Sequence, residues 1–265
     1  MSTPLQAPTP RRGLRLAALL PREHGSWALV AEPLVLAMLA APSWRGTALG
    51  AAGVALFLMR RPWQVVQGAG NDGRRETAGC ALVVLGLFSV ASATFAMSGA
   101  EMGLLGPGIV AAVAAAVFLW FDRQREARAV LAECAGATTF AAWAVAMVVL
   151  AGGDDVLPCA LAVGGFAVAR ALTSILTVRA YVRRRKGQST PVAFPLIVAA
   201  GLFVAALAAA GLLDTWVPAA WLTLFLVRTL WLLGPWAPSW PARRIGWMEA
   251  VLGLLACVTT GPSLS

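Results

Sequence analysis

The chain has 265 residues, of which 59% are hydrophobic and only 12% are charged. Soluble domains carry about 25% charged residues, so most of this surface does not face water and a soluble globular protein is excluded. The net charge of +9 lies in short clusters between apolar runs, which is typical of membrane topology signals and argues against nucleic acid as a partner.

Apolar runs close to 20 residues long recur along the chain, and each is long enough to cross a hydrocarbon core of about 30 Å. Their Ala, Leu, Val and Gly content, without alternation, predicts helices and not barrel strands. We expect nine spans, at residues 24–41, 46–61, 79–98, 102–121, 131–151, 156–178, 192–212, 215–233 and 246–262. This is an all-α membrane protein of about nine transmembrane helices. Residues 1–22 are expected to form a cytoplasmic, partly disordered segment, and residues 23–265 a single polytopic domain.

The basic residues predict the orientation of these spans. They occupy the N-terminal segment and the connections after the second, fourth, sixth and eighth spans, whereas the opposite connections carry Glu101, Asp154, Asp155 and Asp214 and a single arginine, Arg45. By the positive-inside rule, the N-terminus is cytoplasmic and the C-terminus lies outside, in a bacterial inner (cell) membrane.

A polar cluster of Arg22, Glu23 and His24 stands at the entry of the first span. His24 is the only histidine, and an imidazole can act as an acid, a base or an anion donor near neutral pH. Interfacial anchoring is the alternative interpretation. With one histidine, and four cysteines that show no CxxC spacing, we predict no protein metal site and no disulfide framework.

Two helices end in polar stripes on the basic side. On the second, Arg60, Gln64, Gln67 and Asn71 share one helical face, with Arg61 beside them. The sixth carries a similar stripe, which comprises Arg170, Ser174, Thr177, Tyr181 and Arg184, with Arg179 and Arg183 close by. Amides and hydroxyls avoid lipid, so the stripes either join helices or line a cavity. Their positions four helices apart suggest two four-helix halves in parallel repeat, plus a ninth helix.

Ionisable residues inside spans are costly and usually face the protein interior. Five stand out, namely Glu32, Glu133, Arg170, Arg228 and Glu249. Glu32 and Arg170 lie at a similar depth, about 12 Å from the cytoplasmic ends of their helices. Arg228 and Glu249 are either a structural ion pair or part of an anion site. Asp122, Glu126 and Glu133 share a helical face, for which we expect intrahelical salt bridges.

The stretch Pro21 to Pro33, PREHGSWALVAEP, resembles the signature of the YwiC-like family of bacterial membrane proteins. Arg170, Arg179, Arg183, Arg228 and Glu249 resemble other marked positions of that family. The family has no established activity, so this resemblance implies no reaction.

The architecture is similar to that of the UbiA-type prenyltransferases, which have nine helices, an inside N-terminus and active-site loops after the second and sixth helices. Their motifs NDxxDxxxD and DxxxD hold Mg²⁺ against a prenyl diphosphate. Here Asn71 and Asp72 match, but Arg75 and Gly79 stand at the later aspartate positions. The cofactor therefore stays unknown, because Mg²⁺ is possible only through an incomplete motif.

Three functions stay open from the sequence, and with them whether the protein is an enzyme at all. The first is a UbiA-like transferase or binding protein for an isoprenoid or anionic lipid (di)phosphate. Its catalytic candidates are His24, Glu23 and Asp72. Its substrate-binding candidates are Arg61, Gln64, Gln67, Asn71, Arg170, Ser174, Thr177, Arg179, Tyr181, Arg183, Arg228 and Glu249. The others are a secondary transporter of a small anion or metabolite and a non-catalytic assembly partner of a membrane complex.

Overall fold

The computed structural model describes residues 24–68, 72–98, 102–153, 156–189, 191–213 and 215–264. Within these ranges the chain forms nine α-helices and two short 3₁₀ turns, at Met102–Leu104 and Gly261–Ser263. The helices are α1 (His24–Ala40), α2 (Trp44–Gln67), α3 (Asp72–Met97), α4 (Leu105–Arg123), α5 (Val130–Ala151), α6 (Val156–Arg185), α7 (Ala193–Leu213), α8 (Val217–Leu233) and α9 (Ala242–Thr260). The predicted all-α fold of nine helices is confirmed.

Among the residues that the structure describes, five helical segments are long and apolar enough to cross a membrane, namely Gly73–Met97, Leu105–Arg123, Val130–Ala151, Val156–Arg185 and Ala242–Ser263. Three shorter apolar helices occupy Trp27–Ala40, Ala193–Ala206 and Val217–Leu233. The chain is therefore a multi-pass membrane protein that is embedded in a lipid bilayer. α2 joins neither group, since Arg45, Arg60 and Arg61 lie along it.

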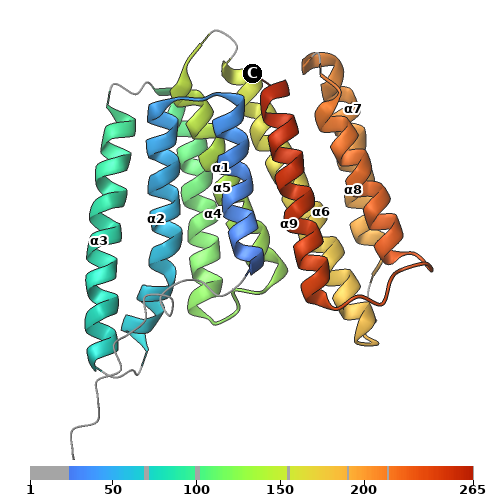
Figure 1. Cartoon of the computed structure of the whole chain (residues 1–265), viewed down its shortest axis with the longest axis horizontal. Coiled ribbons are helices and arrows are strands. Elements are labelled where there is room, and N and C mark those ends of the chain that lie inside the picture. Colours follow the sequence, from blue (N-terminus) through green and yellow to red (C-terminus); the bar gives the residue numbers. More distant parts are fainter. Residues whose placement is uncertain are drawn as a thin grey trace, which may run out of the picture.

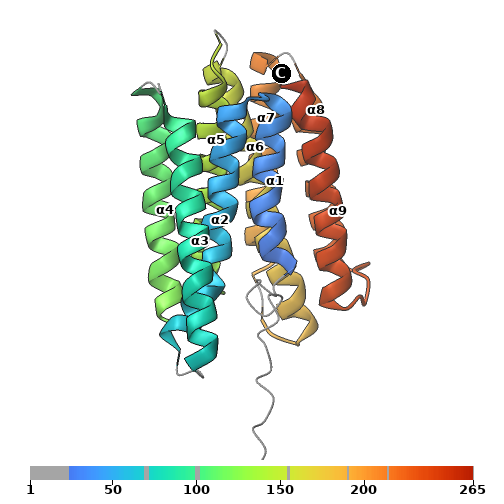
Figure 2. The ribbon, with the colours of Figure 1, turned by 60° about the vertical axis from the view of Figure 1, so that its left-hand side comes forward.

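Consecutive helices run in opposite directions, so the connections alternate between the two ends of the bundle (Figure 1). α5 lies centrally and packs against α1, α2, α4 and α6. α3 packs on α2 at one flank, while α7 and α8 pack together beside α6 at the other (Figure 1). The turned view has α3 and α4 at one edge and α9 at the other (Figure 2). The connections after α2, α4, α6 and α8 share the end that we call the basic end. Its basic residues in the described ranges are Arg60, Arg61, Arg74, Arg75, Arg123, Arg125, Arg128, Arg179, Arg183, Arg184, Arg185, Lys186, Arg243 and Arg244.

Local signals in the sequence explain where several helices begin and end. The Ser43 hydroxyl accepts a hydrogen bond from the Gly46 N–H at 2.9 Å and caps α2. After α5, Gly152 and Gly153 take φ values of 76° and 109°, and Gly187 takes 68° after α6. Side chains disfavour these left-handed conformations, so glycine permits the chain to turn there.

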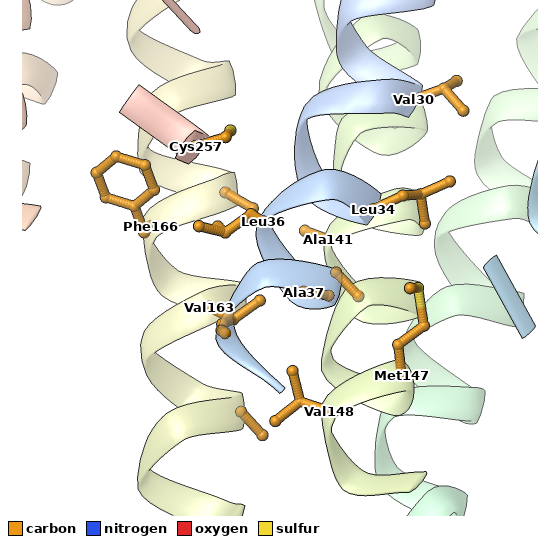
Figure 3. Close-up of a cluster of buried hydrophobic side chains, with 14 of the residues drawn as sticks. Val30, Leu34, Leu36, Ala37, Ala141, Met147, Val148, Val163, Phe166 and Cys257 are labelled. Atoms are coloured by element: carbon orange, nitrogen blue, oxygen red, sulfur yellow. The ribbon is translucent and has the colours of Figure 1, made fainter. Parts of the chain in front are cut away.

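The apolar core lies between α1, α5, α6 and α9. Leu36, Val163 and Phe166 pack there with Met147 and Cys257, and all five are almost fully buried (Figure 3). In contrast, α3 and α4 expose most of their leucine, valine and phenylalanine side chains. Such apolar surfaces suit lipid contact, so the charged groups that matter for function are to be sought among the inner helices.

One side-chain hydrogen bond joins the central helix to α2. The Trp143 Nε1–H donates to the Leu49 carbonyl at 2.7 Å, and Gly53 leaves room for the indole, because a Cβ there would lie 2.9 Å from Nε1. We expect Trp143→Phe to lower the free energy of unfolding by about 0.6–1.7 kcal/mol, measured by detergent denaturation. Trp120→Phe is the control, because Trp120 is exposed on α4, and an equal loss there would contradict the assignment.

Candidate functional site

Four charged side chains from four helices meet inside the bundle. They are Glu32 on α1, Arg170 on α6, Arg228 on α8 and Glu249 on α9, with relative exposures of 8%, 4%, 5% and 6%. We call this set the charge cluster. It holds two carboxylates and two guanidiniums, so it is neutral as a whole when all four groups are ionised. Neutrality matters because an unpaired charge in a low-dielectric interior costs several kcal/mol.

Glu249 is the most firmly held member of the charge cluster. Its carboxylate accepts hydrogen bonds from Ser174 at 2.6 Å, from Nη1 of Arg170 at 3.4 Å and from Nη1 of Arg228. Arg170 also donates through Nη2 to the Glu249 carbonyl at 2.7 Å. Within the described ranges, Glu249 is the one carboxylate that pairs with Arg228. This glutamate therefore links both arginines.

Glu32 is held more loosely than Glu249. Within the described part of the chain, its carboxylate has one ion-pair contact, with Nη2 of Arg170 at 3.3 Å. The close approach of α1 and α9 at this level depends on Gly253, because a Cβ built there would overlap the Glu32 carboxylate and lie 2.6 Å from Nη2 of Arg170. Glu32 and Glu249 thus share one guanidinium, and Glu249 has the additional donors.

An aromatic ring lies against both guanidiniums. The Arg170 and Arg228 Cζ atoms are 4.9 Å and 5.6 Å from the centroid of Phe225, which is fully buried. A cation over an aromatic face is attracted by the ring quadrupole. Phe225 therefore supports the two positive charges inside the bundle.

The surroundings of the charge cluster differ between its two sides along the bundle. On the side away from the basic end, α1, α6 and α9 continue into the apolar core with Leu36, Phe166 and Cys257 (Figure 3). Toward the basic end, hydroxyl groups follow, and Thr177 and Thr229 lie 2.9 Å apart beside Nη2 of Arg228. Polar contacts therefore extend from the cluster toward the basic end and not toward the opposite one.

A small pocket adjoins Glu32 and Arg170. It is lined by Leu29, Glu32, Pro33, Leu36, Phe166, Ala167, Arg170, Ala171 and Cys257, and its interior has room for about one water molecule. Pro33 lies inside α1 and lacks an N–H, so the Leu29 carbonyl loses its intrahelical donor. The Nε atoms of Arg170 and Arg228 have no hydrogen-bond partner among the described residues. These hydrogen-bonding groups near the pocket thus lack a partner among the described residues, although buried polar groups usually have one.

The sixth-helix candidates divide between the charge cluster and the basic end. Arg170, Ser174 and Thr177 lie in or beside the cluster. Tyr181 is buried, and its hydroxyl donates a hydrogen bond to the Pro238 carbonyl at 2.5 Å. Arg179 pairs with Glu133 of α5 at 3.0 Å, whereas Arg183 is exposed.

The second-helix candidates face a different partner. Gln64 Nε2 lies 3.3 Å from the Asp122 carboxylate on α4, which also pairs with Arg60 at 2.8 Å. Arg61 donates to Gln64 at 3.2 Å, and Gln67 is exposed. The structure thus does not bring the two polar stripes together around one cavity.

The structure shows ion pairs between helices where the sequence predicted salt bridges within one helix. Asp122 pairs with Arg60 on α2, and Glu133 pairs with Arg179 on α6. These carboxylates therefore join neighbouring helices, because the helices pack closely enough for arginine to reach across.

Some candidates lie outside what the structure describes. Residues 1–22, Glu23 and Asn71 are outside the described ranges, as are the side chains of His24 and Asp72. Among the described residues, no three histidine, cysteine or acidic side chains gather to hold a metal ion.

Sequence reasoning noted Glu32 as a buried charge but did not include it among the site residues, and it missed Gly253 and Phe225. Glu32 had a usable signal, because it lies at the depth of Arg170. Gly253 and Phe225 had none, since one glycine and one phenylalanine among many apolar residues do not differ from lipid-facing or packing positions.

Residues 20–148 match the family model described as YwiC-like protein. The predicted YwiC-like resemblance is confirmed over these residues, which include Glu32 but not Arg170, Arg228 or Glu249. No curated protein and no solved structure matches the chain.

Proposed function

We propose that this protein is a proton-coupled secondary transporter of a small monovalent anion. Arg170 binds the anion and Glu32 carries the proton. The observation that supports this most directly is the sharing of Arg170 between a firmly held carboxylate, Glu249, and a loosely held one, Glu32.

The coupling follows from charge balance. Protonation of Glu32 gives the charge cluster one net positive charge, and a monovalent anion at Arg170 returns it to zero. Burial makes the unbalanced state costly, so proton and anion are favoured together. The charged and titratable groups around Glu32 are Arg170 on α6 and Glu249 and Cys257 on α9. One proton and one anion would then move in the same direction without net charge transfer.

The membrane orientation belongs to the same proposal. We place the basic end, and with it the N-terminus, in the cytoplasm, because positive charge accumulates at the connections on that side. The hydroxyl groups between the charge cluster and the basic end support access from the cytoplasm. The apolar core around Leu36 and Phe166 is then the closed outer barrier of this state.

A UbiA-like transferase for a lipid (di)phosphate is the runner-up. It is less well supported, because Arg170, Arg179 and Arg228 each pair with a carboxylate instead of lining an open anion cavity. A non-catalytic assembly partner has no particular contact in its favour.

Transport is tested with purified protein in liposomes that contain a pH-sensitive dye. Inward gradients of chloride, nitrate, formate and lactate are applied in turn. We expect at least one anion to acidify the lumen. Glu32→Gln should stop proton movement but retain exchange of that anion, and Arg170→Gln should stop both.

Glu133→Gln serves as the matched control, because Glu133 is also ion-paired but lies outside the charge cluster. Absence of acidification with all four anions, or normal proton movement in Glu32→Gln, would refute coupled transport. A transferase assay with prenyl diphosphates then becomes the next experiment.

A further inference from the structure

A second pocket lies at the basic end, between the end of α6 and the connection from α8 to α9. Its volume is about 240 Å³, and its lining comprises Tyr181, Arg184, Arg185, Leu232, Gly234, Pro235, Ala237, Pro238 and Ser239. This volume is somewhat below the range of about 300–1,000 Å³ that is usual for whole small-molecule sites, so the pocket suits a single polar group and not a whole drug-sized molecule. The pocket is separate from the charge cluster and plays no part in the proposed transport.

The pocket is built by contacts from α6 to the connection. Nη1 of Arg184 donates to the carbonyls of Leu233 and Gly234, and Nη1 of Arg185 donates to the Trp240 carbonyl. The Tyr181 hydroxyl also lies 2.9 Å from the Trp240 carbonyl. These contacts and three prolines, Pro235, Pro238 and Pro241, hold the connection against α6, so the pocket has a defined wall.

The pocket carries two positive charges that have no carboxylate partner among the described residues. Within the described ranges, the ion pairs of arginine involve Arg60, Arg170, Arg179 and Arg228, and none involves Arg184 or Arg185. Among the described residues, each of these two guanidiniums donates only through Nη1, and its other N–H groups have no partner there. Two adjacent guanidiniums with free donors are suited to a phosphate group.

The position of the pocket along the bundle indicates which kind of molecule carries that phosphate. Trp231 and Trp240 pack edge to face at 5.3 Å, Arg244 stacks on Trp240 at 4.2 Å, and Trp236 is 81% exposed. Exposed tryptophans beside arginines at helix ends are typical of the headgroup region of a bilayer. A basic pocket at this level is where anionic lipid headgroups bind.

We infer that this pocket binds the phosphate group of an anionic phospholipid through Arg184 and Arg185. The acyl chains then lie along the apolar surface beside α8, next to Trp236. The bound lipid contacts the α8–α9 connection on its lipid-facing side, whereas the two arginines contact the same connection from α6.

The experiment uses the full chain in detergent and measures retained lipid by native mass spectrometry, with phosphatidylglycerol and phosphatidylcholine as probes. We expect a preference for phosphatidylglycerol. In the double variant Arg184→Gln with Arg185→Gln, its affinity should fall about 30-fold, as expected for two arginines near a membrane surface. The double variant Arg183→Gln with Lys186→Gln removes the same charge from the end of α6 and the residue after it. Neither residue lines the pocket, so the affinity for phosphatidylglycerol should change little.

A further variant tests whether lipid binding is lost only because the α8–α9 connection has detached from α6. Ser239→Glu adds a carboxylate to the pocket wall and leaves both arginines and their carbonyl contacts in place, and it should also abolish the preference. Equal loss in the two double variants, or an unchanged preference in Ser239→Glu, overturns the site. Inorganic phosphate at millimolar concentration is added as a competitor. Displacement of the lipid by this phosphate would overturn the assignment to a lipid.

Discussion

Glu249→Gln is expected to destabilise the protein by about 3–5 kcal/mol, because it leaves a buried guanidinium without its carboxylate. Arg228 is 5% exposed and has no other carboxylate partner among the described residues. Arg170 keeps Glu32. The free energy of unfolding is to be measured by denaturant titration in mixed micelles, on protein that still elutes as a single species.

Two further variants separate the ion pair from general damage to the core. Glu32→Gln should cost clearly less than Glu249→Gln, because Arg170 retains Glu249. The double change Arg228→Met with Glu249→Leu should recover much of the stability lost in Glu249→Gln, since apolar side chains of similar size often replace a buried ion pair at little cost. A double variant as unstable as the sum of its single changes would contradict the pairing.

Gly253→Val is expected to separate Glu32 from Arg170. A Cβ at this position overlaps the Glu32 carboxylate and approaches Nη2 of Arg170 to 2.6 Å, and α1 and α9 are too closely packed for either side chain to move freely. Overpacking of this kind typically costs about 1–3 kcal/mol. Coupled proton and anion movement should be lost as well, because the two groups no longer share a contact.

Gly246→Ala is the matched control on the same helix, because a Cβ there meets no atom within 4 Å. Alanine favours a helix over glycine by about 1 kcal/mol, so this variant should be neutral or slightly more stable. Gly253→Ala adds only the Cβ atom at this position and so tests the smallest possible clash with Glu32 and Arg170. If Gly253→Ala and Gly246→Ala behaved alike in both stability and transport, the close approach at Gly253 would carry no function.

The fold was largely predictable because bilayer thickness and the clusters of arginine set the length and the number of helices. Glu32 and Arg170 were also predictable in part. Their depths follow from residue count along each helix, and the structure brings them within 3.3 Å of each other. The depth of a residue along its helix can therefore be predicted from the sequence alone.

The depth of a residue in the membrane does not tell which neighbouring helix its side chain faces. Gln64 and Ser174 both belong to polar stripes at the basic side, yet Gln64 faces Asp122 on α4, whereas Ser174 faces Glu249 on α9. Which helices become neighbours is decided by packing among many similar Ala, Leu and Val surfaces. For the same reason, the pairing of Glu133 with Arg179 could not be distinguished from a bridge within one helix.

The ion pair between Glu32 and Arg170 joins residues that are 138 positions apart, and this separation has a consequence for biogenesis. An ionised side chain at the centre of an inserting helix costs about 2.5–3.5 kcal/mol. At about 5–20 residues per second, the ribosome needs about 7–28 s after Glu32 to reach Arg170. During that interval α1 has no arginine partner from α6, and Glu249 emerges later still. The charge cluster that includes Glu32 of α1 is therefore completed only after α9 has been made.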